Sequence, residues 1–223
     1  PSTIEKMGNI VSNWGINNNS IQFNDSSFIK IEQDEDITID DDNNNIINLG
    51  HKLNLLNGVF SFTLNVWVRF PIDFYGPCTI LSKNGYYRYG LDVNGRFYSR
   101  EFEITNKTNN SIESLDTWNN GYWNMVTFVS DMGSGISASQ NRSIYVNGNL
   151  LESRIVDNPS GFLDYNETIS LIENSDLDSE NIVYVSSYNG VEDFLPNGTQ
   201  LDDLAIFYNA KNSYYSIIWI HPL

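Results

Sequence analysis

Residues 60–70 read FSFTLNVWVRF, and apolar and polar side chains alternate along them with a period of two. This alternation is typical of a β-strand that buries one face, because successive side chains of a strand point to opposite faces. Trp67 interrupts the polar side of the pattern. The segment is therefore predicted to be an antiparallel strand with an apolar inner face and an outer face that is partly covered.

Two segments farther along the chain carry related patterns. Residues 123–131, WNMVTFVSD, are predicted to form a second half-buried strand. Residues 144–153, IYVNGNLLES, are predicted to form a hairpin, because Asn147-Gly148 readily adopts the positive φ angles of a tight two-residue turn. Three strands of this kind in this order indicate an all-β sandwich.

Asn94-Gly95 is a second dipeptide of the same kind, and it predicts another hairpin within residues 86–104. The first strand of this hairpin has two different faces. One face is predicted to join the core, and the other to point away from it; the first consists of Tyr87, Tyr89, Leu91 and Val93, and the second of Tyr86, Arg88 and Asp92.

Short apolar segments extend the strand series along the chain. Residues 20–23 and 28–32 are expected to form two strands joined by a turn, because the sequence Asn-Asp-Ser-Ser between them favours turns. Further strands are expected at 79–83, 182–187 and 201–208, residues 214–221 fit a short helix or a final strand, and residues 157–180 receive no assignment. The series predicts one all-β domain over residues 1–223, a two-sheet antiparallel jelly-roll sandwich.

The chain is strongly acidic, with a net charge of −16 and no cluster of Lys or Arg. Nucleic acids and anionic lipids attract basic patches, so neither is an expected partner. The acidity is interpreted as a solubilising surface charge, with a cation-binding surface as the alternative. No apolar run is long enough to span a bilayer, and the first residues do not resemble a signal peptide.

The sequence offers little for catalysis. Cys78 is the single cysteine and is expected to be a buried thiol, and His51 and His221 are the only histidines. A glycosidase would need paired carboxylates, for which Glu101 with Glu103 and Glu192 with Asp193 are the nearest candidates, but no third carboxylate follows on the strand. The chain is therefore predicted not to be an enzyme.

Six motifs occur here in the order found in one known family. They read FTLNVWV, ILSK, NG, WNMVTFV, YVNGNL and DDLAIFYNA, at residues 62–68, 80–83, 94–95, 123–129, 145–150 and 202–210. The series resembles the concanavalin A-like, laminin-G-type jelly roll. Within that group, residues 18–32, 62–71 and 142–153 resemble most the N-terminal half of the receptor-binding region of clostridial neurotoxins and their non-toxic relatives, although the opening strand before Met7 is missing from the pattern.

The resemblance implies a non-enzymatic, lectin-like module for glycan or cell-surface recognition in a secreted, toxin-like or cell-surface protein. The module would be part of a larger protein with neighbouring domains. Two alternatives remain open: a structural spacer or interaction domain of a larger assembly, and a glycan hydrolase on the same fold.

The expected ligand is a neutral glycan or a protein surface, because the acidic chain repels polyanionic sugars. The candidate binding residues are the aromatic and basic side chains of the hairpin at 86–104, with one tryptophan outside it: Tyr86, Arg88, Arg100 and Trp118. The family position of Trp67 and Trp123 implies that both are core residues. No cofactor is expected; the resemblance leaves Ca²⁺ as the one candidate ion, with Asp131, Asp202 and Asp203 as the available acids.

Overall fold

The computed structural model of the chain describes residues 3–13, 20–32, 36–40, 46–51, 62–72, 74, 76–83, 87–102, 109–117, 121–132, 140–156, 182–208 and 215–220. Every regular element among them is a β-strand. The strands are β1 (Thr3–Asn13), β2 (Ser20–Glu32), β3 (Asp36–Asp40), β4 (Ile46–His51), β5 (Phe62–Arg69), β6 (Cys78–Lys83), β7 (Tyr87–Leu91), β8 (Arg96–Phe102), β9 (Asn109–Thr117), β10 (Asn124–Met132), β11 (Gln140–Val146), β12 (Asn149–Val156), β13 (Ile182–Val185), β14 (Thr199–Tyr208) and β15 (Tyr215–Ile220).

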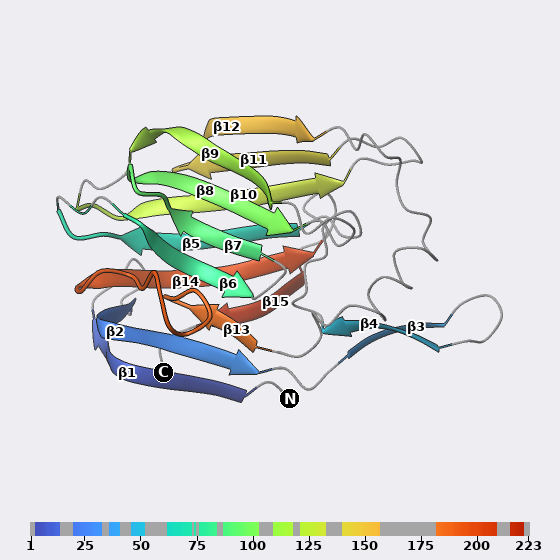
Figure 1. The fold of residues 1–223 in the computed structure, drawn as a ribbon, viewed down its shortest axis with the longest axis horizontal. Helices are drawn as coiled ribbons and strands as arrows, with labels where there is room; N and C mark the ends of the chain where they lie inside the picture. Colours follow the sequence, from blue (N-terminus) through green and yellow to red (C-terminus); the bar gives the residue numbers. More distant parts are fainter. Residues whose placement is uncertain are drawn as a thin grey trace.

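Most strands belong to one curled antiparallel ribbon (Figure 1). Its order is β12-β11-β10-β5-β14-β2-β13-β6-β7-β8-β9, with β1 added to β2 and β15 to β14, while β3 and β4 form a separate pair. The ribbon curls until β9, at one end of the order, contacts β11 and β12 at the other. Two layers result, one around β5 and β10 and one around β6 to β8. The predicted all-β jelly-roll sandwich is confirmed.

The core lies between these layers. Along β5 the buried and half-buried side chains alternate as the sequence predicts, with Phe62, Leu64, Val66 and Val68 fully buried. Rings from the facing layer contact them, since the ring of Tyr89 on β7 lies 6.3 Å from that of Phe62 between centroids. Trp67 and Trp123 are half-buried and stand outside this core, so the family-based expectation for them is wrong.

Strand β2 is the corner at which the ribbon passes from one layer to the other. Its first half pairs with β14, from Ile21 to Phe23, and its second half pairs with β13, from Ile29 to Glu32. Asp25 and Ser26 between them have φ angles of 51° and 59°. The turn chemistry of this segment therefore bends one continuous strand, and the expected pair of strands joined by a turn is wrong.

The two Asn-Gly hairpins turn differently. Asn147 and Gly148 both have positive φ, at 51° and 78°, as a two-residue turn requires. At the other hairpin only Gly95 has positive φ, at 73°, because Asp92 accepts hydrogen bonds through its carboxylate from the backbone N–H groups of Asn94 and Arg96, both at 2.8 Å. This longer loop begins at Asp92, two residues earlier than predicted, and leaves Val93 67% exposed, so Val93 is not a core residue.

Three strands, β1, β4 and β9, lie where the sequence suggested none. β1 pairs with almost the whole of β2, and it starts before Met7, so the opening strand is present. Of the two alternatives for the C-terminal segment, the structure shows a strand, β15. Within the described residues no helix could cross a membrane. Residues 157–181 lie outside the described part of the chain.

Candidate binding site

The structure describes the candidate residues to different extents. Arg88 lies on β7 and stands directly opposite Arg100 of β8 in the strand register. The side chain of Arg100 is not among the described atoms, and Tyr86 and Trp118 lie outside the described residues. Register alone places Arg88 and Arg100 on one face of the sheet.

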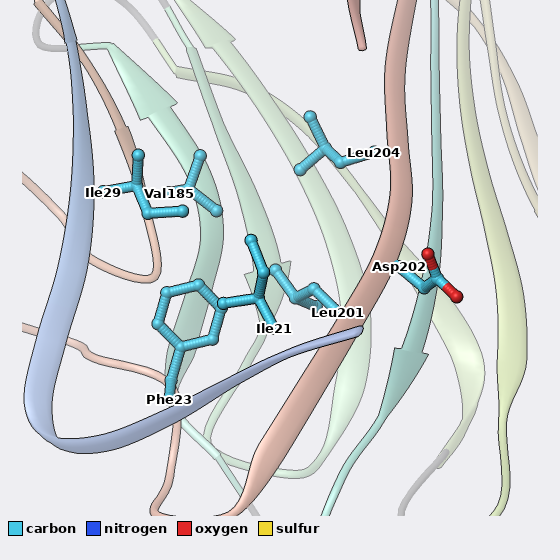
Figure 2. A pocket seen from close by; sticks show the side chains of 7 residues that line it. All are labelled: Ile21, Phe23, Ile29, Val185, Leu201, Asp202 and Leu204. Atoms are coloured by element: carbon cyan, nitrogen blue, oxygen red, sulfur yellow. The ribbon is translucent and has the colours of Figure 1, made fainter. Parts of the chain in front are cut away.

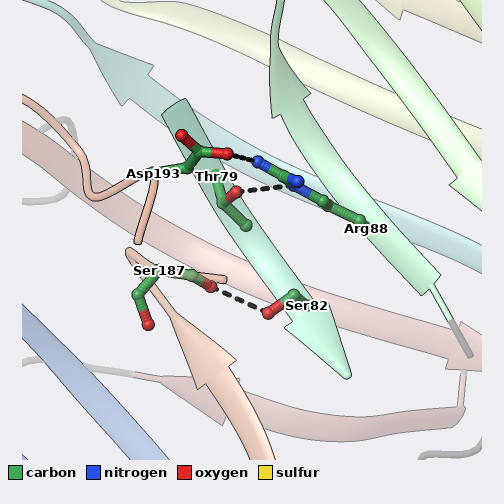
Figure 3. Close-up of polar contacts among 5 residues, drawn as sticks. All are labelled: Thr79, Ser82, Arg88, Ser187 and Asp193. Atoms are coloured by element: carbon green, nitrogen blue, oxygen red, sulfur yellow. Dashed lines mark hydrogen bonds and ion pairs between the residues drawn. The ribbon is translucent and has the colours of Figure 1, made fainter. Parts of the chain in front are cut away.

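Strand alternation turns Arg88 away from the core. Its neighbours Tyr87 and Tyr89 are fully buried in the core cluster, as predicted, so the side chain between them points to the outer face. Arg88 donates from Nε to Oγ1 of Thr79 on the adjacent strand β6, at 2.9 Å. Its Nη2 pairs with Oδ2 of Asp193 (Figure 3). The side chains of Arg88 and Asp193 are 13% and 28% exposed.

Asp193 belongs to the segment between β13 and β14, and we call residues 186–195 the covering loop. The covering loop is hydrogen-bonded to β6 next to the positions at which β6 pairs with β13. Ser186 donates its N–H to the carbonyl of Ile80 at 3.0 Å, and Thr79 donates its N–H to the carbonyl of Asp193 at 2.7 Å. Ser82 adds a bond from its Oγ to the carbonyl of Ser187 at 2.8 Å (Figure 3). The loop is thus fixed beside Arg88.

Two tyrosine rings complete the surroundings of Arg88. The guanidinium carbon lies 4.4 Å from the ring centroid of Tyr188, in the covering loop, and 5.7 Å from that of Tyr98 on β8. Both distances are within the range of a cation–π interaction. Tyr98 is buried, whereas Tyr188 is half-buried.

The resulting cluster combines a cation, a carboxylate and an aromatic ring near the surface. Sequence reasoning found Arg88 but missed Tyr188, and it considered Asp193 only as a possible catalytic acid beside Glu192. The pairing joins residues 105 positions apart, so no local pattern reveals it. The one local signal is the turn-forming sequence SYNG at residues 187–190, which predicts a loop with an aromatic residue in it.

The three acids considered for Ca²⁺ do not converge. Asp202 pairs with Trp67 of β5, whereas Asp131 lies beyond Ser130, which pairs with Phe62 at the other end of the same strand. Five residues of strand separate these positions by roughly 17 Å. Asp202 is buried and accepts the N–H of Asp203 at 2.9 Å through Oδ1. No group of three His, Cys, Asp or Glu side chains in the described ranges could hold a metal ion, so these acids do not fit a shared Ca²⁺ site.

The carboxylates considered for glycan hydrolysis are also dispersed. Glu101 lies on β8, opposite Tyr87, and Glu103 falls outside the described residues. Asp193 is paired with Arg88, and Glu192 beside it is exposed. His51 lies at the end of β4, and His221 is outside the described part of the chain.

A small cavity lies inside the sandwich where β2 changes layers (Figure 2). Its volume is about 10 Å³, and its lining consists of Ile21, Phe23, Ile29, Val185, Leu201, Asp202 and Leu204. A cavity of this size is at the lower limit for one water molecule. Pockets that enclose small-molecule ligands are larger, roughly 300 Å³ or more, so this cavity cannot hold a sugar.

Solved structures of low sequence identity share this fold. The binding domain of Paraclostridial mosquitocidal protein 1 superposes with a TM-score of 0.59 at 15% identity, covering 95% of this chain and 45% of that one. The binding domain of botulinum neurotoxin serotype D gives 0.55 at 14% identity, covering 92% and 42%. Domain 4 of an extracellular arabinanase from Geobacillus stearothermophilus, in complex with arabinotriose, gives 0.51 at 16% identity, covering 93% and 82%.

The chain thus spans less than half the length of the two toxin binding domains. The resemblance to these toxin domains, inferred from the motifs, is confirmed at the level of the fold. No curated protein sequence matches the chain. The family model described as the concanavalin A-like lectin/glucanases superfamily matches residues 41–213. Because this match covers most of the sequence, the chain belongs to the concanavalin A-like lectin/glucanases superfamily.

Proposed function

We propose that this chain is a lectin-like module that binds a neutral glycan and catalyses no reaction. Three solved structures of the same fold support a binding role: two are binding domains of toxins, and the third is an arabinanase domain in complex with arabinotriose, a neutral oligosaccharide. The arabinanase is an extracellular enzyme, which supports a secreted or cell-surface location. Residues 1–223 would form one domain of a larger protein and would pack against neighbouring domains of that protein.

The observation that carries the proposal is the ordered polar and aromatic cluster around Arg88. A guanidinium fixed by Thr79 and Asp193 presents directed hydrogen-bond donors, and an aromatic ring presents a flat apolar surface. A sugar combines hydroxyl groups with apolar C–H faces, so this pairing of chemistries suits it. Tyr86 and Arg100, on the same hairpin, would extend this surface, and Trp118 would add a further ring.

The net charge of −16 determines which sugars can bind. Sialylated or sulfated glycans would be repelled by the protein as a whole, and Arg88 cannot compensate because Asp193 already neutralises it. A neutral glycan carries no such penalty. An uncharged or basic protein surface is the second ligand class compatible with this charge.

A glycan array that includes neutral and polyanionic sugars tests the proposal, with calorimetry on arabinotriose and on each positive glycan. The expected result is binding to neutral glycans, weakened by the double change Tyr86→Ala and Arg100→Ala without loss of the fold. Binding confined to polyanionic sugars would contradict the proposal.

The two alternatives are separated by different measurements. A structural spacer would bind no glycan and would show its affinity only toward the neighbouring domains of its own protein. A hydrolase would release reducing sugars from a polysaccharide panel, and Glu101→Gln or Glu103→Gln would abolish that release. We expect no release from any polysaccharide of the panel.

A further inference from the structure

The covering loop has an unusual backbone. Ser186, Asn189 and Asp193 have φ angles of 75°, 58° and 49°, in the left-handed region that side-chain-bearing residues seldom adopt. The cost is on the order of 1 kcal/mol or more for Ser186 and is smaller for Asn189 and Asp193, because Asn and Asp tolerate this region better. The loop therefore holds a defined shape at an energetic cost, although it contributes few apolar residues to the core.

The position of Asp193 explains how this shape is maintained. Its carbonyl accepts the N–H of Thr79, and its carboxylate pairs with Arg88, so β6 and β7 hold it from two sides. Only Oδ2 takes part in this pair. Among the described residues nothing donates a hydrogen bond to Oδ1, and the side chain is more than a quarter exposed. Within the described part of the chain, the carboxylate of Asp193 is thus fixed, partly exposed, and bonded through one of its two oxygens.

Tyr188 stands beside this carboxylate and is also fixed. Its N–H donates to the carbonyl of Glu192 at 2.8 Å, which closes the tip of the loop. Gly190 donates its N–H to Oγ of Ser187 at 3.0 Å within the same turn. The ring and the Asp193 carboxylate both contact the Arg88 guanidinium, so they lie close together, and Tyr188 is only half-buried.

We propose that the covering loop provides the second half of the glycan site, with Tyr188 stacking on a sugar ring and Asp193 accepting hydrogen bonds from its hydroxyl groups. Arg88 also positions this half of the site, since its guanidinium contacts both side chains. This inference rests on the proposed function. It specifies an uncharged sugar, because the Asp193–Arg88 pair is neutral overall and the exposed Glu192 beside it repels anions.

The test uses Tyr188→Leu and Asp193→Asn, measured by calorimetry against arabinotriose and the strongest neutral glycan of the array. Tyr188→Leu keeps an apolar side chain beside Arg88 but removes the flat ring. Asp193→Asn keeps the shape of the side chain but removes its charge. Each is expected to weaken binding by roughly tenfold or more, the size of one charge-assisted hydrogen bond or one stacking contact.

Two matched variants control for unspecific effects. Glu192→Gln removes the neighbouring exposed charge, and Tyr122→Ala removes an exposed tyrosine from a different loop; both should bind as the parent does. Thermal unfolding of every variant shows whether the fold is intact. Asp193→Asn also breaks the ion pair with Arg88 and could unfold the protein for that reason. If it does, Tyr188→Leu is the decisive variant.

The outcomes separate this inference from the proposed function. Binding of neutral glycans that is lost on changing Tyr86 and Arg100 but unaffected by Tyr188→Leu and Asp193→Asn would overturn the role of the loop and leave the proposed function standing. A parent protein that binds no neutral glycan would overturn both. If Glu192→Gln weakened glycan binding as much as Asp193→Asn does, the effect would come from negative charge in general and not from Asp193 itself.

Discussion

Asp25 and Asn197 bind each other twice across 172 positions of sequence. The backbone N–H of Asp25 donates to Oδ1 of Asn197 at 2.6 Å, and Nδ2 of Asn197 donates to Oδ1 of Asp25 at 3.3 Å. Asp25 is the first left-handed residue of the bend in β2, and Asn197 precedes β14. The contact therefore joins the corner strand to the loop that leads into its partner strand.

Replacing Asn197 by Ala should destabilise the protein by about 1 kcal/mol, because the N–H of Asp25 loses its acceptor and an exposed hydrogen bond has about this net value. Urea unfolding followed by circular dichroism measures the change. Asn149→Ala is the matched control, since Asn149 is also exposed, and it should stay within about 0.5 kcal/mol of the parent. Equal loss in both variants would show that the Asp25 contact contributes nothing.

Local sequence predicted the strands whose two faces differ in polarity. β5 and β7 were predicted because their apolar side chains alternate and enter one core. β1 and β9 were missed because neither has a clean alternation; β1, TIEKMGNIVSN, mixes charged and apolar residues on both faces. Its strand conformation depends on hydrogen bonds to β2, and that partner is a tertiary feature.

The turn-forming residues predicted the local backbone conformation correctly, but they did not predict how the strands connect. Asp25 and Ser26 do adopt left-handed angles, but the chain continues in the same strand because β1 pairs on both sides of the bend. The candidate site shows the same limit. The outward direction of Arg88 follows from the period of its strand, whereas its partners Asp193 and Tyr188 reach it only through the folding of a distant loop.

Two glycines should respond to Ala substitution for different reasons. A Cβ on Gly90 would lie 2.0 Å from the carbonyl oxygen of Cys78 on the adjacent strand, so Gly90→Ala should separate β6 from β7. A loss of at least about 3 kcal/mol is expected, at the upper end for overpacking in a rigid core. Gly148 has open space around its Cβ position but a φ of 78°, so Gly148→Ala should cost only about 1 kcal/mol.

Chemical denaturation of these variants and of Gly148→Asn checks this prediction. Asn tolerates the left-handed conformation better than Ala, so Gly148→Asn should recover part of the lost stability. Equal losses of stability in Gly90→Ala and Gly148→Ala would contradict the close approach of β6 and β7 at Gly90.

Asp92 should act as a cap of its turn. Its carboxylate accepts the N–H groups of Asn94 and Arg96, and the side chain is buried, so Asp92→Ala leaves two backbone donors without their acceptor. A loss of roughly 2 kcal/mol is expected. Asp92→Asn, which keeps one carbonyl oxygen, should lose less. Thermal unfolding of both variants gives the comparison, and identical losses would assign the effect to charge alone.

The thiol of Cys78 should be inert in the folded protein. Burial raises the pKa of this thiol to about 12 from an ordinary value of 9.0, because the charged thiolate would lose its hydration. A thiol reagent such as Ellman's reagent at pH 8 should therefore react only as fast as the protein unfolds. Rapid reaction under native conditions would contradict the burial of this side chain.

The same shift makes stability depend on alkaline pH. Because the folded-state pKa lies above the unfolded value, the neutral thiol favours the fold fully below about pH 9, and this contribution is lost as the pH rises toward 12. Tyrosines and lysines also titrate in this range, so the parent must be compared with Cys78→Ala at each pH. The variant should be less stable near pH 7, since it lacks a buried sulfur atom, and the difference should shrink above pH 9. A difference that stays constant from pH 7 to pH 11 would show that Cys78 ionises as readily in the folded chain as in the unfolded one.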